Sequence, residues 1–367
     1  MTKKDRVFVI TNAMTPLNKS GEVTTSKFVR TICGAYKQVI IVGGNVTLEE
    51  DLNNICIESY DYKKEGNKFQ KLLGMFKLQR QMAAYIRNNV KKGNHVIFWL
   101  GDKMFLPFKA AKKVTDHVGY FVYGNLAAEG NNSLFMKLSA KLVMYMANNA
   151  DRVFVESKAV KDGWNGQIKK DVYELHLYTD IIGFNPYENR KNKIGMLCRM
   201  AGVKHVIESI HAFHELHNLY PNWSLELVGS GLQENECKKL INELGADQYI
   251  KVYGWMNKES VIQITDEWKY NMLASDHEGL PNSMIEMMGK GIPIIATPVG
   301  GIPDLLTDNV NGFVLSGTTV SAIKDGLFRA IAADNYDELA RNAFNTVNEK
   351  YSLTGAKREA AEVLLTW

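Results

Sequence analysis

Short runs rich in β-branched and aromatic residues alternate with helix-length segments along all 367 residues of this chain. Alternation of this kind builds βαβ units, in which helices cover both faces of a parallel sheet. The runs that predict strands are 6–11, 38–43, 95–100, 118–123, 152–156, 193–198, 224–229, 249–253, 270–274 and 292–296. The segments that predict helices are 24–35, 68–91, 132–149, 204–219, 233–244, 258–268, 282–290, 319–332 and 337–349. We therefore expect an α/β protein with doubly wound parallel sheets.

The alternating pattern occurs twice, on either side of the stretch "YTDIIGFNPYENRKN" at 178–192. A chain of this length exceeds one ordinary hydrophobic core, which favours two domains of about 180 residues each. We place one Rossmann-like domain over 1–180 and a second over 181–350, with a terminal segment over 351–367. Ligands of such domains bind beyond the carboxyl ends of the strands. Two domains that face each other across a cleft would supply loops to one shared site.

Composition limits the class of partner. The chain is 46% apolar and 23% charged, and its net charge of +4 is too small to argue for nucleic acid by itself. Its four cysteines show no CxxC spacing, which favours reduced thiols in a cytosolic protein. The N-terminal "MTKKDRVFVI" lacks the apolar region of a signal peptide, and no run is apolar for about 18 residues. We expect a cytoplasmic protein without a nucleic-acid partner, and contact with a membrane surface stays open.

Two cations follow the strand predicted at 193–198. Arg199 comes directly after the strand, and Lys204 lies where the next helix begins. A guanidinium fork and an ammonium group at a helix start suit a polyanion such as a diphosphate. Ordinary surface cations are the competing interpretation. The next strand ends in "LVGSG" and lacks the third glycine of a dinucleotide fingerprint, so it is a weak signal.

The stretch "SDHEGLPNSMIE" at 275–286 places two glutamates, Glu278 and Glu286, around a predicted helix start. Pro281 suits the first helical position, which would leave the N–H groups of 282–284 free to bind an anion. Carboxylates beside such an anion site accept hydrogen bonds from hydroxyl groups. A molecule with hydroxyls on either side of a diphosphate is a nucleotide sugar. Upstream, "VYGWM" at 252–256 ends a strand in a glycine turn against which a planar base could pack.

These motifs together resemble the retaining glycosyltransferases of the GT4 type, which have the GT-B fold. The similarity runs in order over about 178–315 and includes "EGLPNSMIE", "MMGKGIPIIATPVGGIPDLLTDNVNGFVL" and the E-x7-E spacing. The resemblance implies that Arg199, Lys204 and Glu278 are catalytic. It implies that the donor is bound by Gly21, Gly254, Trp255, Met256, Gly279, Leu280, Pro281, Asn282, Ser283 and Glu286. Within that set Glu278 would contact the donor sugar and Glu286 the ribose.

The sequence departs from the family in two places. The family usually has Lys-Gly where this chain has Lys204-His205, and many members carry a histidine at the end of a strand in the first domain. The corresponding stretch here, "GYFVYGNLAAEG", has none. Asp102 and Asn125 are the candidates for the acceptor side of the site. Residues 297–301 would form a supporting turn beneath the donor.

The first half of the chain carries two further features. Gly21 is expected in a loop before a helix that begins near Thr24 or Thr25, where it lines the cleft or serves only the turn. Residues 63–92 contain nine Lys or Arg and one Glu, with apolar residues at helical spacing. Such a helix can lie on an anionic membrane. We favour packing of the apolar stripe on the domain's own sheet, although membrane contact would suit a lipid-carried acceptor.

The expected reaction is the metal-independent, retaining transfer of a sugar from a nucleotide diphosphate, UDP rather than GDP, to a hydroxyl of a glycan or lipid-linked saccharide. No Asp-x-Asp occurs, and the histidines at 211, 214 and 217 lack the spacing of a zinc site. No cofactor or metal is therefore expected. Two alternatives are a nucleotide-sugar 2-epimerase on the same fold and a non-catalytic partner subunit. The segment 351–367 resembles the family's terminal helix, which packs back toward the first domain.

Overall fold

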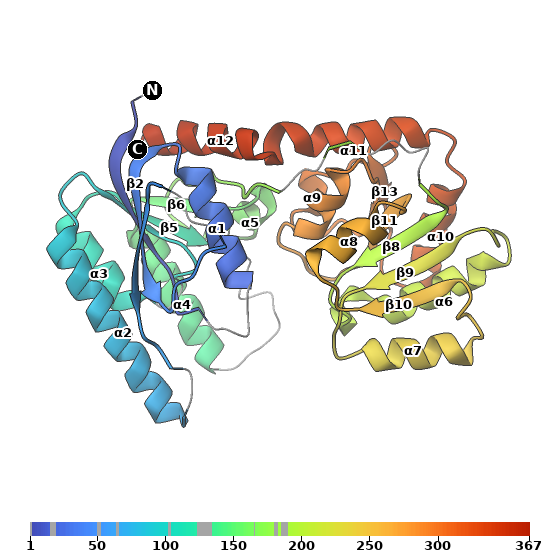
Figure 1. The fold of residues 1–367 in the computed structure, drawn as a ribbon, viewed down its shortest axis with the longest axis horizontal. Coiled ribbons are helices and arrows are strands. Elements are labelled where there is room, and N and C mark those ends of the chain that lie inside the picture. The colour runs from blue at the N-terminus through green and yellow to red at the C-terminus, as the bar shows by residue number, and fades with distance from the viewer. Residues whose placement is uncertain are drawn as a thin grey trace. The chain divides into compact units, whose positions relative to one another are not determined.

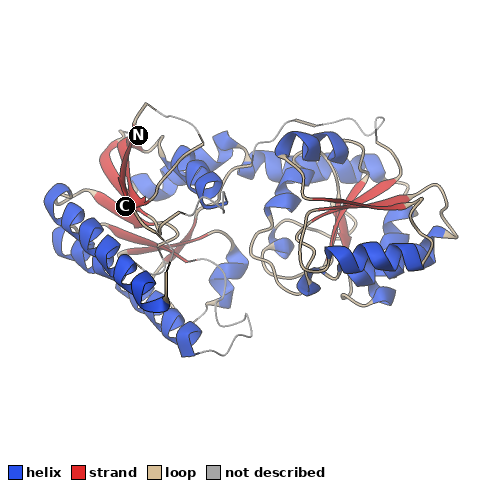
Figure 2. Ribbon diagram, turned by 60° about the horizontal axis from the view of Figure 1, so that its bottom comes forward, coloured by secondary structure: helices blue, strands red, loops and turns tan. Residues whose placement is uncertain are grey.

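The computed structural model describes residues 2–14, 20–49, 53–63, 66–101, 104–122, 134–164, 166–179, 183–184 and 190–367. The chain divides into two compact units (Figure 1). The first unit comprises Met1–Tyr178 together with Leu353–Trp367, and the second comprises Thr179–Ser352. Each unit has one parallel sheet with helices on both faces (Figure 2). The prediction of doubly wound parallel sheets is confirmed.

The sheet of the first unit has seven parallel strands in the order β3-β2-β1-β4-β5-β6-β7. Their bounds are β1 (Lys4–Ile10), β2 (Tyr36–Gly44), β3 (Ile55–Tyr60), β4 (His95–Phe98), β5 (Val118–Val122), β6 (Arg152–Val155) and β7 (Val172–Glu174). The two edge strands, β3 and β7, were not predicted. Both are only partly buried, so they lack the continuous apolar run that marks a central parallel strand.

The helices of this unit are α1 (Ser20–Ile32), α2 (Lys68–Asn89), α3 (Phe105–Val114), α4 (Leu134–Asn149), α5 (Lys158–Gly163) and α12 (Leu353–Leu365). Helices α1 and α12 pack on one face of the sheet, and α2 to α5 pack on the other. Two of these helices were missed. Pro107 within the first turn of α3 obscured its pattern, and α5 has only six residues. The predicted start of the first helix near Thr24 was wrong, since the helix begins at Ser20.

The last helix is bound to the first unit by side chains at the ends of two strands, β6 and β7. Arg152 donates to the carbonyl oxygens of Val363 (2.6 Å) and Thr366 (2.9 Å). His176 Nδ1 lies 2.8 Å from one carboxylate oxygen of Glu359. The two hydrogen bonds of Arg152 satisfy carbonyl groups at the end of α12, which lack partners within the helix. Residues 353–367 therefore belong to the same compact unit as the N-terminal strands.

A histidine is buried where β4 begins. Its Nε2 lies 3.3 Å from Lys4 Nζ and its Nδ1 lies 2.8 Å from Tyr36 Oη, while its ring contacts those of His117 and Trp367. Since the ammonium group can only donate, Nε2 of the neutral ring accepts and Nδ1–H donates to Tyr36. Burial, with the nearby charges of Lys4, His117 and Arg152, lowers the pKa of His95 to about 3. His95 is therefore neutral at physiological pH.

The second unit has six parallel strands in the order β10-β9-β8-β11-β12-β13. They are β8 (Lys193–Leu197), β9 (Ser224–Val228), β10 (Ile250–Gly254), β11 (Tyr270–Leu273), β12 (Ile294–Ala296) and β13 (Gly312–Val314). The helices are α6 (Val206–His217), α7 (Glu234–Glu243), α8 (Lys258–Thr265), α9 (Asn282–Met288), α10 (Val320–Ile331) and α11 (Tyr336–Tyr351), with short 3₁₀ turns η2 (Gly202–Lys204) and η3 (Ile302–Asp304). Helices α6, α7 and α10 cover one face, and α8 and α9 cover the other.

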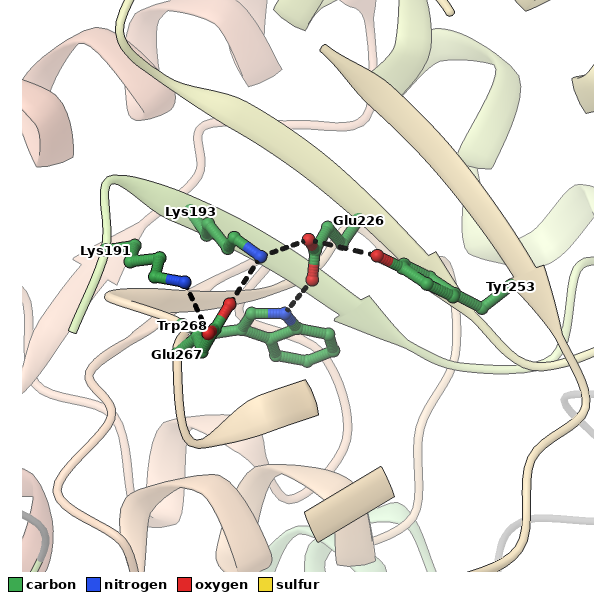
Figure 3. Close-up of polar contacts among 6 residues, drawn as sticks. All are labelled: Lys191, Lys193, Glu226, Tyr253, Glu267 and Trp268. Atoms are coloured by element: carbon green, nitrogen blue, oxygen red, sulfur yellow. Dashed lines mark hydrogen bonds and ion pairs between the residues drawn. The ribbon is translucent and has the colours of Figure 1, made fainter. Parts of the chain in front are cut away.

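A buried glutamate ties the strands of this sheet together (Figure 3). Glu226 on β9 accepts from Lys193 Nζ at 2.6 Å, from the Trp268 indole at 2.7 Å and from the Tyr253 hydroxyl at 3.3 Å. Burial alone would lower the pKa of Lys193, but its hydrogen bonds to Glu226 and Glu267 outweigh burial and raise it. These contacts link β8, β9 and β10 to Trp268, which lies just before β11. They hold in place the strands whose carboxyl ends carry the candidate site.

The burial of His95 leads us to predict how the free energy of unfolding changes with pH. An unfolded chain binds a proton at this residue below about pH 6.5, whereas the folded chain binds one only near pH 3. The free energy of unfolding should therefore fall as the pH is lowered between these values, and His95→Gln should flatten that slope. Denaturant unfolding from pH 7 to pH 4 measures it, with the exposed His277→Gln as control. Parallel curves for His95→Gln and the wild type would contradict the assignment.

Candidate functional site

The carboxyl edge of the second sheet contains a topological switch point. From β8 the chain moves outward through β9 and β10 on one side, and from β11 it moves outward through β12 and β13 on the other. Ligands of open α/β sheets bind where the strand order reverses in this way, because the two flanking loops diverge and leave a crevice. The structure places Arg199 and Lys204 after β8 and Glu278 after β11, so the three predicted catalytic residues flank the switch point.

Two of these three side chains contact each other. Lys204 Nζ forms an ion pair with Glu278, and Ser275 Oγ donates to the same carboxylate oxygen at 2.7 Å. The Lys204 and Glu278 side chains are only 16% and 10% exposed, so solvent screens this pair weakly. Arg199 is exposed, and among the described residues its side chain has no ion-pair or hydrogen-bond partner. An anion at this edge would therefore meet two cations, Lys204, which is paired with Glu278, and the exposed Arg199.

The residue after Lys204 has an unusual backbone. His205 adopts a left-handed conformation, with φ 44° and ψ 42°, where η2 ends and α6 begins. Glycine enters this region without steric cost, and a residue with a Cβ does not. The glycine that usually follows the lysine in the family suits this left-handed conformation, and in this chain His205 adopts it instead. Its Nε2 lies 2.8 Å from Asp276 Oδ1, a contact that links the loops after β8 and β11.

Glycines allow the neighbouring strand-end loops to meet backbone to backbone. Gly229 has φ 129°, and a Cβ there would overlap the carbonyl oxygen of Cys198. A Cβ on Gly231 would overlap the carbonyl group of Met200. The backbone N–H of Met200 in turn donates to Ser230 O at 3.0 Å. The "GSG" that gave only a weak sequence signal is therefore needed to pack against the segment that carries Arg199. We find no separate phosphate loop in this stretch.

The turn at 297–301 supports Glu278 from below. Gly300 has φ 58°, and a Cβ there would overlap the carbonyl oxygen of Glu278, while the Gly301 N–H donates to Gly279 O at 2.6 Å. Thr297 Oγ1 donates to Ser275 O at 2.6 Å and accepts from Ser275 N at 2.9 Å. Ser275 was not among the predicted site residues, whereas Gly300 belongs to the turn at 297–301 that was expected to support the donor. Their signal lay in the adjacent "SDHEG" and "PVGG", but only the fold shows that these segments touch.

Helix α9 begins at Asn282, the first residue of the predicted segment 282–290. Pro281 is its N-cap, with ψ 114°, and Asn282 is its first residue, so the assignment of Pro281 to the first helical position was wrong. The Met284 N–H donates to Pro281 O at 3.0 Å. In the first turn of α9, the backbone N–H groups of Asn282 and Ser283 therefore have no acceptor among the described residues. Glu286 lies half-buried on the second turn, four residues before the buried Lys290.

Other predicted donor residues lie beside this edge. Gly254 ends β10 with φ 72°, and the Trp255 side chain that follows is 76% exposed. Met256 and Leu280 are half-buried against the apolar cluster under α9. Gly279 contributes its carbonyl group to the turn at 297–301. An exposed indole at a strand end is a surface on which a planar ring could stack.

Three predicted site residues, Gly21, Asp102 and Asn125, belong to the first unit. Gly21 lies in the first turn of α1, not in the preceding loop, and a Cβ there would meet no atom within 4 Å. The packing of the described residues therefore does not require a glycine at position 21, and a contact of Gly21 with a ligand stays a prediction. Asp102 and Asn125, the acceptor-side candidates, lie outside the described residues.

Two titratable groups near the site have structural roles. Burial raises the pKa of the Cys198 thiol to about 12, so this cysteine is uncharged beside Arg199 and is a poor nucleophile. Burial lowers the pKa of Lys290, whose ammonium group donates to Ile262 O, Thr265 Oγ1 and Asp266 Oδ1 at 2.7–3.0 Å. Lys290 therefore closes the end of α8 and does not face the strand-end loops.

Within the part of the chain that the structure describes, no three His, Cys, Asp or Glu side chains are grouped to hold a metal ion. The described helices also include none with the length and apolar character that crossing a bilayer requires.

Comparison with protein families decides the class of the second unit. Residues 178–346, which include every strand of the second sheet, match the model of the family "Glycosyl transferases group 1". The second unit belongs to the group 1 glycosyltransferases. The switch-point edge described above is thus part of a domain from a family of sugar-transferring enzymes.

Curated relatives of this chain are distant. An uncharacterized glycosyltransferase of Methanocaldococcus jannaschii is 24% identical over 54% of this chain and 50% of its own length. An uncharacterized glycosyltransferase of Haemophilus influenzae is 25% identical over 78% of this chain and 79% of its own. The lipopolysaccharide 1,6-galactosyltransferase of Escherichia coli K12 is 30% identical over 32% and 33%. The match to the first of these proteins spans about half of that protein's length.

A solved structure shows the same fold over nearly the whole chain. The crystal structure of Anabaena HepE in complex with UDP and glucose covers 98% of this chain and 99% of its own, with a TM-score of 0.75 and 16% identity. At this level of identity the likeness establishes the GT-B fold.

Gly300 generates a prediction about the supporting turn. In Gly300→Ala the new Cβ would overlap Glu278 O in a left-handed backbone, so the loop that carries Glu278 must move. We expect a loss of about 2 kcal/mol or more in the free energy of unfolding. Urea unfolding measures it. Gly317→Ala is the matched control, because its Cβ would meet only an ordinary contact. Equal stability of the two variants would contradict this role.

The left-handed His205 generates a second prediction. Both His205→Ala and His205→Gly remove the contact with Asp276, but only glycine relieves the strained backbone. We expect His205→Gly to be more stable than His205→Ala by about 1 kcal/mol. Paired denaturant titrations under one set of conditions test this order, and the reverse order would show that residue 205 is not left-handed in solution.

Proposed function

We propose that this chain is a GT4-type, retaining glycosyltransferase that moves a sugar from a nucleotide diphosphate to a hydroxyl acceptor. The acceptor class is a glycan or a lipid-linked saccharide in cell-surface polysaccharide synthesis. UDP is the expected nucleotide, because the structurally similar HepE was solved with UDP and glucose. The E. coli lipopolysaccharide galactosyltransferase among the relatives supports the acceptor class. The site of action is the cytoplasm, at the inner face of the membrane.

The observation that carries the proposal is the charge arrangement at the switch point. Arg199 is open, Lys204 is paired with Glu278, and the N–H groups of Asn282 and Ser283 begin α9. A diphosphate bound at this edge would attract both cations. A carboxylate beside a diphosphate is unfavourable unless a cation lies between them or the carboxylate accepts a hydrogen bond from a neutral donor.

The same arrangement suggests how the residues divide the work. When the diphosphate binds, Lys204 can turn from Glu278 to the phosphate oxygens, and Glu278 then accepts from a sugar hydroxyl. Ser275 continues to donate to Glu278 and holds it in place. Charge develops on the leaving diphosphate as the glycosidic bond breaks, and fixed cations stabilise that charge without a metal. Trp255 and Met256 are the proposed contacts of the base, and Glu286 that of the ribose.

A prediction that separates the two roles concerns Glu278. Glu278→Gln removes a negative charge next to the diphosphate and releases Lys204 from its ion pair. We expect UDP to bind as tightly as in the wild type or more tightly, whereas transfer or hydrolysis of the UDP-sugar falls about 100-fold or more. Arg199→Ala should weaken UDP binding about 10- to 100-fold, since it removes a charged hydrogen-bond donor.

Calorimetric titration of UDP and assay of a UDP-sugar panel measure both effects, with Lys239→Ala on the exposed surface of α7 as control. The proposed site is wrong if Arg199→Ala binds UDP like the wild type. A product inverted at C2 of the sugar would identify the epimerase instead. Absence of binding by every nucleotide sugar tested would indicate a non-catalytic subunit.

A further inference from the structure

Three of the four helices on one face of the first sheet lack acidic residues, and the fourth, α5, contains Asp162. Helices α2, α3 and α4 lie side by side on the same face of the sheet, and their sequences contain no Asp or Glu (Figure 1). The basic residues of the three helices are Lys68, Lys71, Lys77, Arg80, Arg87, Lys109, Lys112, Lys113, Lys137 and Lys141. A nearby acid, Asp151, is already paired with Lys112 at 2.5 Å. This face therefore carries an uncompensated positive charge.

Helix α2 has two apolar faces. Leu78, Met82 and Ile86 are buried against the sheet, as the sequence led us to expect. A second stripe, made of Phe69, Leu72, Leu73 and Phe76, is 51–67% exposed. The expectation that all the apolar residues of this segment pack on the domain's own sheet was therefore wrong.

The geometry of α2 explains why this stripe is exposed. The helix has 22 residues and is about 33 Å long, and the longest described strand of the sheet, β2, spans about 30 Å, so the exposure depends on where the helix begins relative to the sheet. Its N-terminal half extends past the sheet in Figure 1. The four exposed residues are spaced i, i+3, i+4 and i+7, which places them on a single side of the helix. They form one continuous apolar stripe.

Cations border the stripe. Lys77 and Arg80 are exposed beside it, and the Arg80 guanidinium lies 5.9 Å from the centre of the Phe76 ring. Helix α4 adds exposed apolar side chains of its own, Leu138 at 57% and Tyr145 at 45%. An apolar stripe bordered by Lys and Arg, with no acid on the helix, is the pattern of a helix that lies in a lipid headgroup region.

We propose that the α2 stripe and the basic face around it bind the surface of an anionic phospholipid bilayer. Phe69, Leu72, Leu73 and Phe76 enter the boundary between headgroups and acyl chains, and the lysines and arginines of α2 to α4 contact the lipid phosphates. A second copy of the chain fits less well, because it would bring two acid-free basic faces together. Nucleic acid would use the cations but leave the leucines and phenylalanines exposed to water.

This proposal does not depend on the proposed sugar transfer, since it rests on a surface of the first unit alone. The experiment is co-sedimentation of the full chain with phosphatidylcholine vesicles and with vesicles that also contain phosphatidylglycerol. We expect binding to the anionic vesicles, and we expect added salt to weaken it because cations supply part of the attraction. Equal partition to both kinds of vesicle would overturn the proposal.

The apolar contribution is tested by Phe69→Ser/Leu72→Ser. We expect its partition to anionic vesicles to fall about tenfold or more. The matched control is Leu219→Ser/Leu232→Ser in the second unit, which removes two side chains that are 69% and 100% exposed and should bind like the wild type. Circular dichroism establishes that both double variants are folded.

The charged contribution is tested by Lys77→Glu/Arg80→Glu against Lys239→Glu/Lys251→Glu, which changes the net charge equally at exposed positions of the second unit. Only the first pair should lose binding, about tenfold or more. Equal loss in both pairs would reduce the effect to net charge and overturn the assigned surface. A dimer seen by light scattering that Phe69→Ser/Leu72→Ser dissolves, without vesicle binding by the wild type, would make a second copy the occupant and also overturn the proposal.

Discussion

Backbone-to-backbone contact between strand-end loops holds the carboxyl edge of the second sheet in place. The loops after β8 and β9 meet at Gly229 and Gly231, and the loops after β11 and β12 meet at Gly300. Side chains at these three positions would overlap a neighbouring carbonyl group, so the edge cannot close around larger residues. Because the loops pack this tightly, they present Arg199 and Glu278 from fixed positions on either side of the switch point.

The charges at this edge are balanced before any ligand arrives. Lys204 and Glu278 are largely buried and would each be costly alone, and their mutual contact offsets much of that cost. A bound anion competes for Lys204 and so changes the surroundings of Glu278. Under the proposed function the ion pair is a resting arrangement that a diphosphate would reorganise, while Ser275 and the turn at 297–301 keep the carboxylate in position.

The first unit has the same type of fold, but its surface carries an exposed apolar stripe beside basic helices. Its sheet is buried between helices as in the second unit, but α2, α3 and α4 on one face lack acids, and α2 extends past the sheet that it covers (Figure 1). A helix that extends past its sheet has apolar positions that the core cannot bury. On α2 these positions form a stripe bordered by cations, which is a feature of an interaction surface and contributes nothing to the core.

Local pattern alone was sufficient for much of this protein. The central strands are continuous apolar runs, the long helices carry their apolar residues at helical spacing, and "EGLPNSMIE" with Arg199 and Lys204 placed the candidate site on the second half of the chain. Elements with weak local signals were missed, such as the partly exposed edge strand β3 and the helix α3 with its proline. The beginning of α1 was misplaced, and Pro281 is the N-cap of α9 and not its first residue, because helix ends depend on single caps and not on periodicity.

Only the tertiary structure decided which of these residues meet. The pairing of Lys204 with Glu278 and the contact of Gly300 with the Glu278 loop join segments far apart in the sequence, and they follow from β8 and β11 lying side by side. The left-handed backbone at His205 likewise has no signature in its own side chain. The outward stripe on α2 depends on where the helix begins relative to its sheet. Periodicity shows that a residue is apolar and on one side of a helix, but only the packed neighbours determine whether that side is covered.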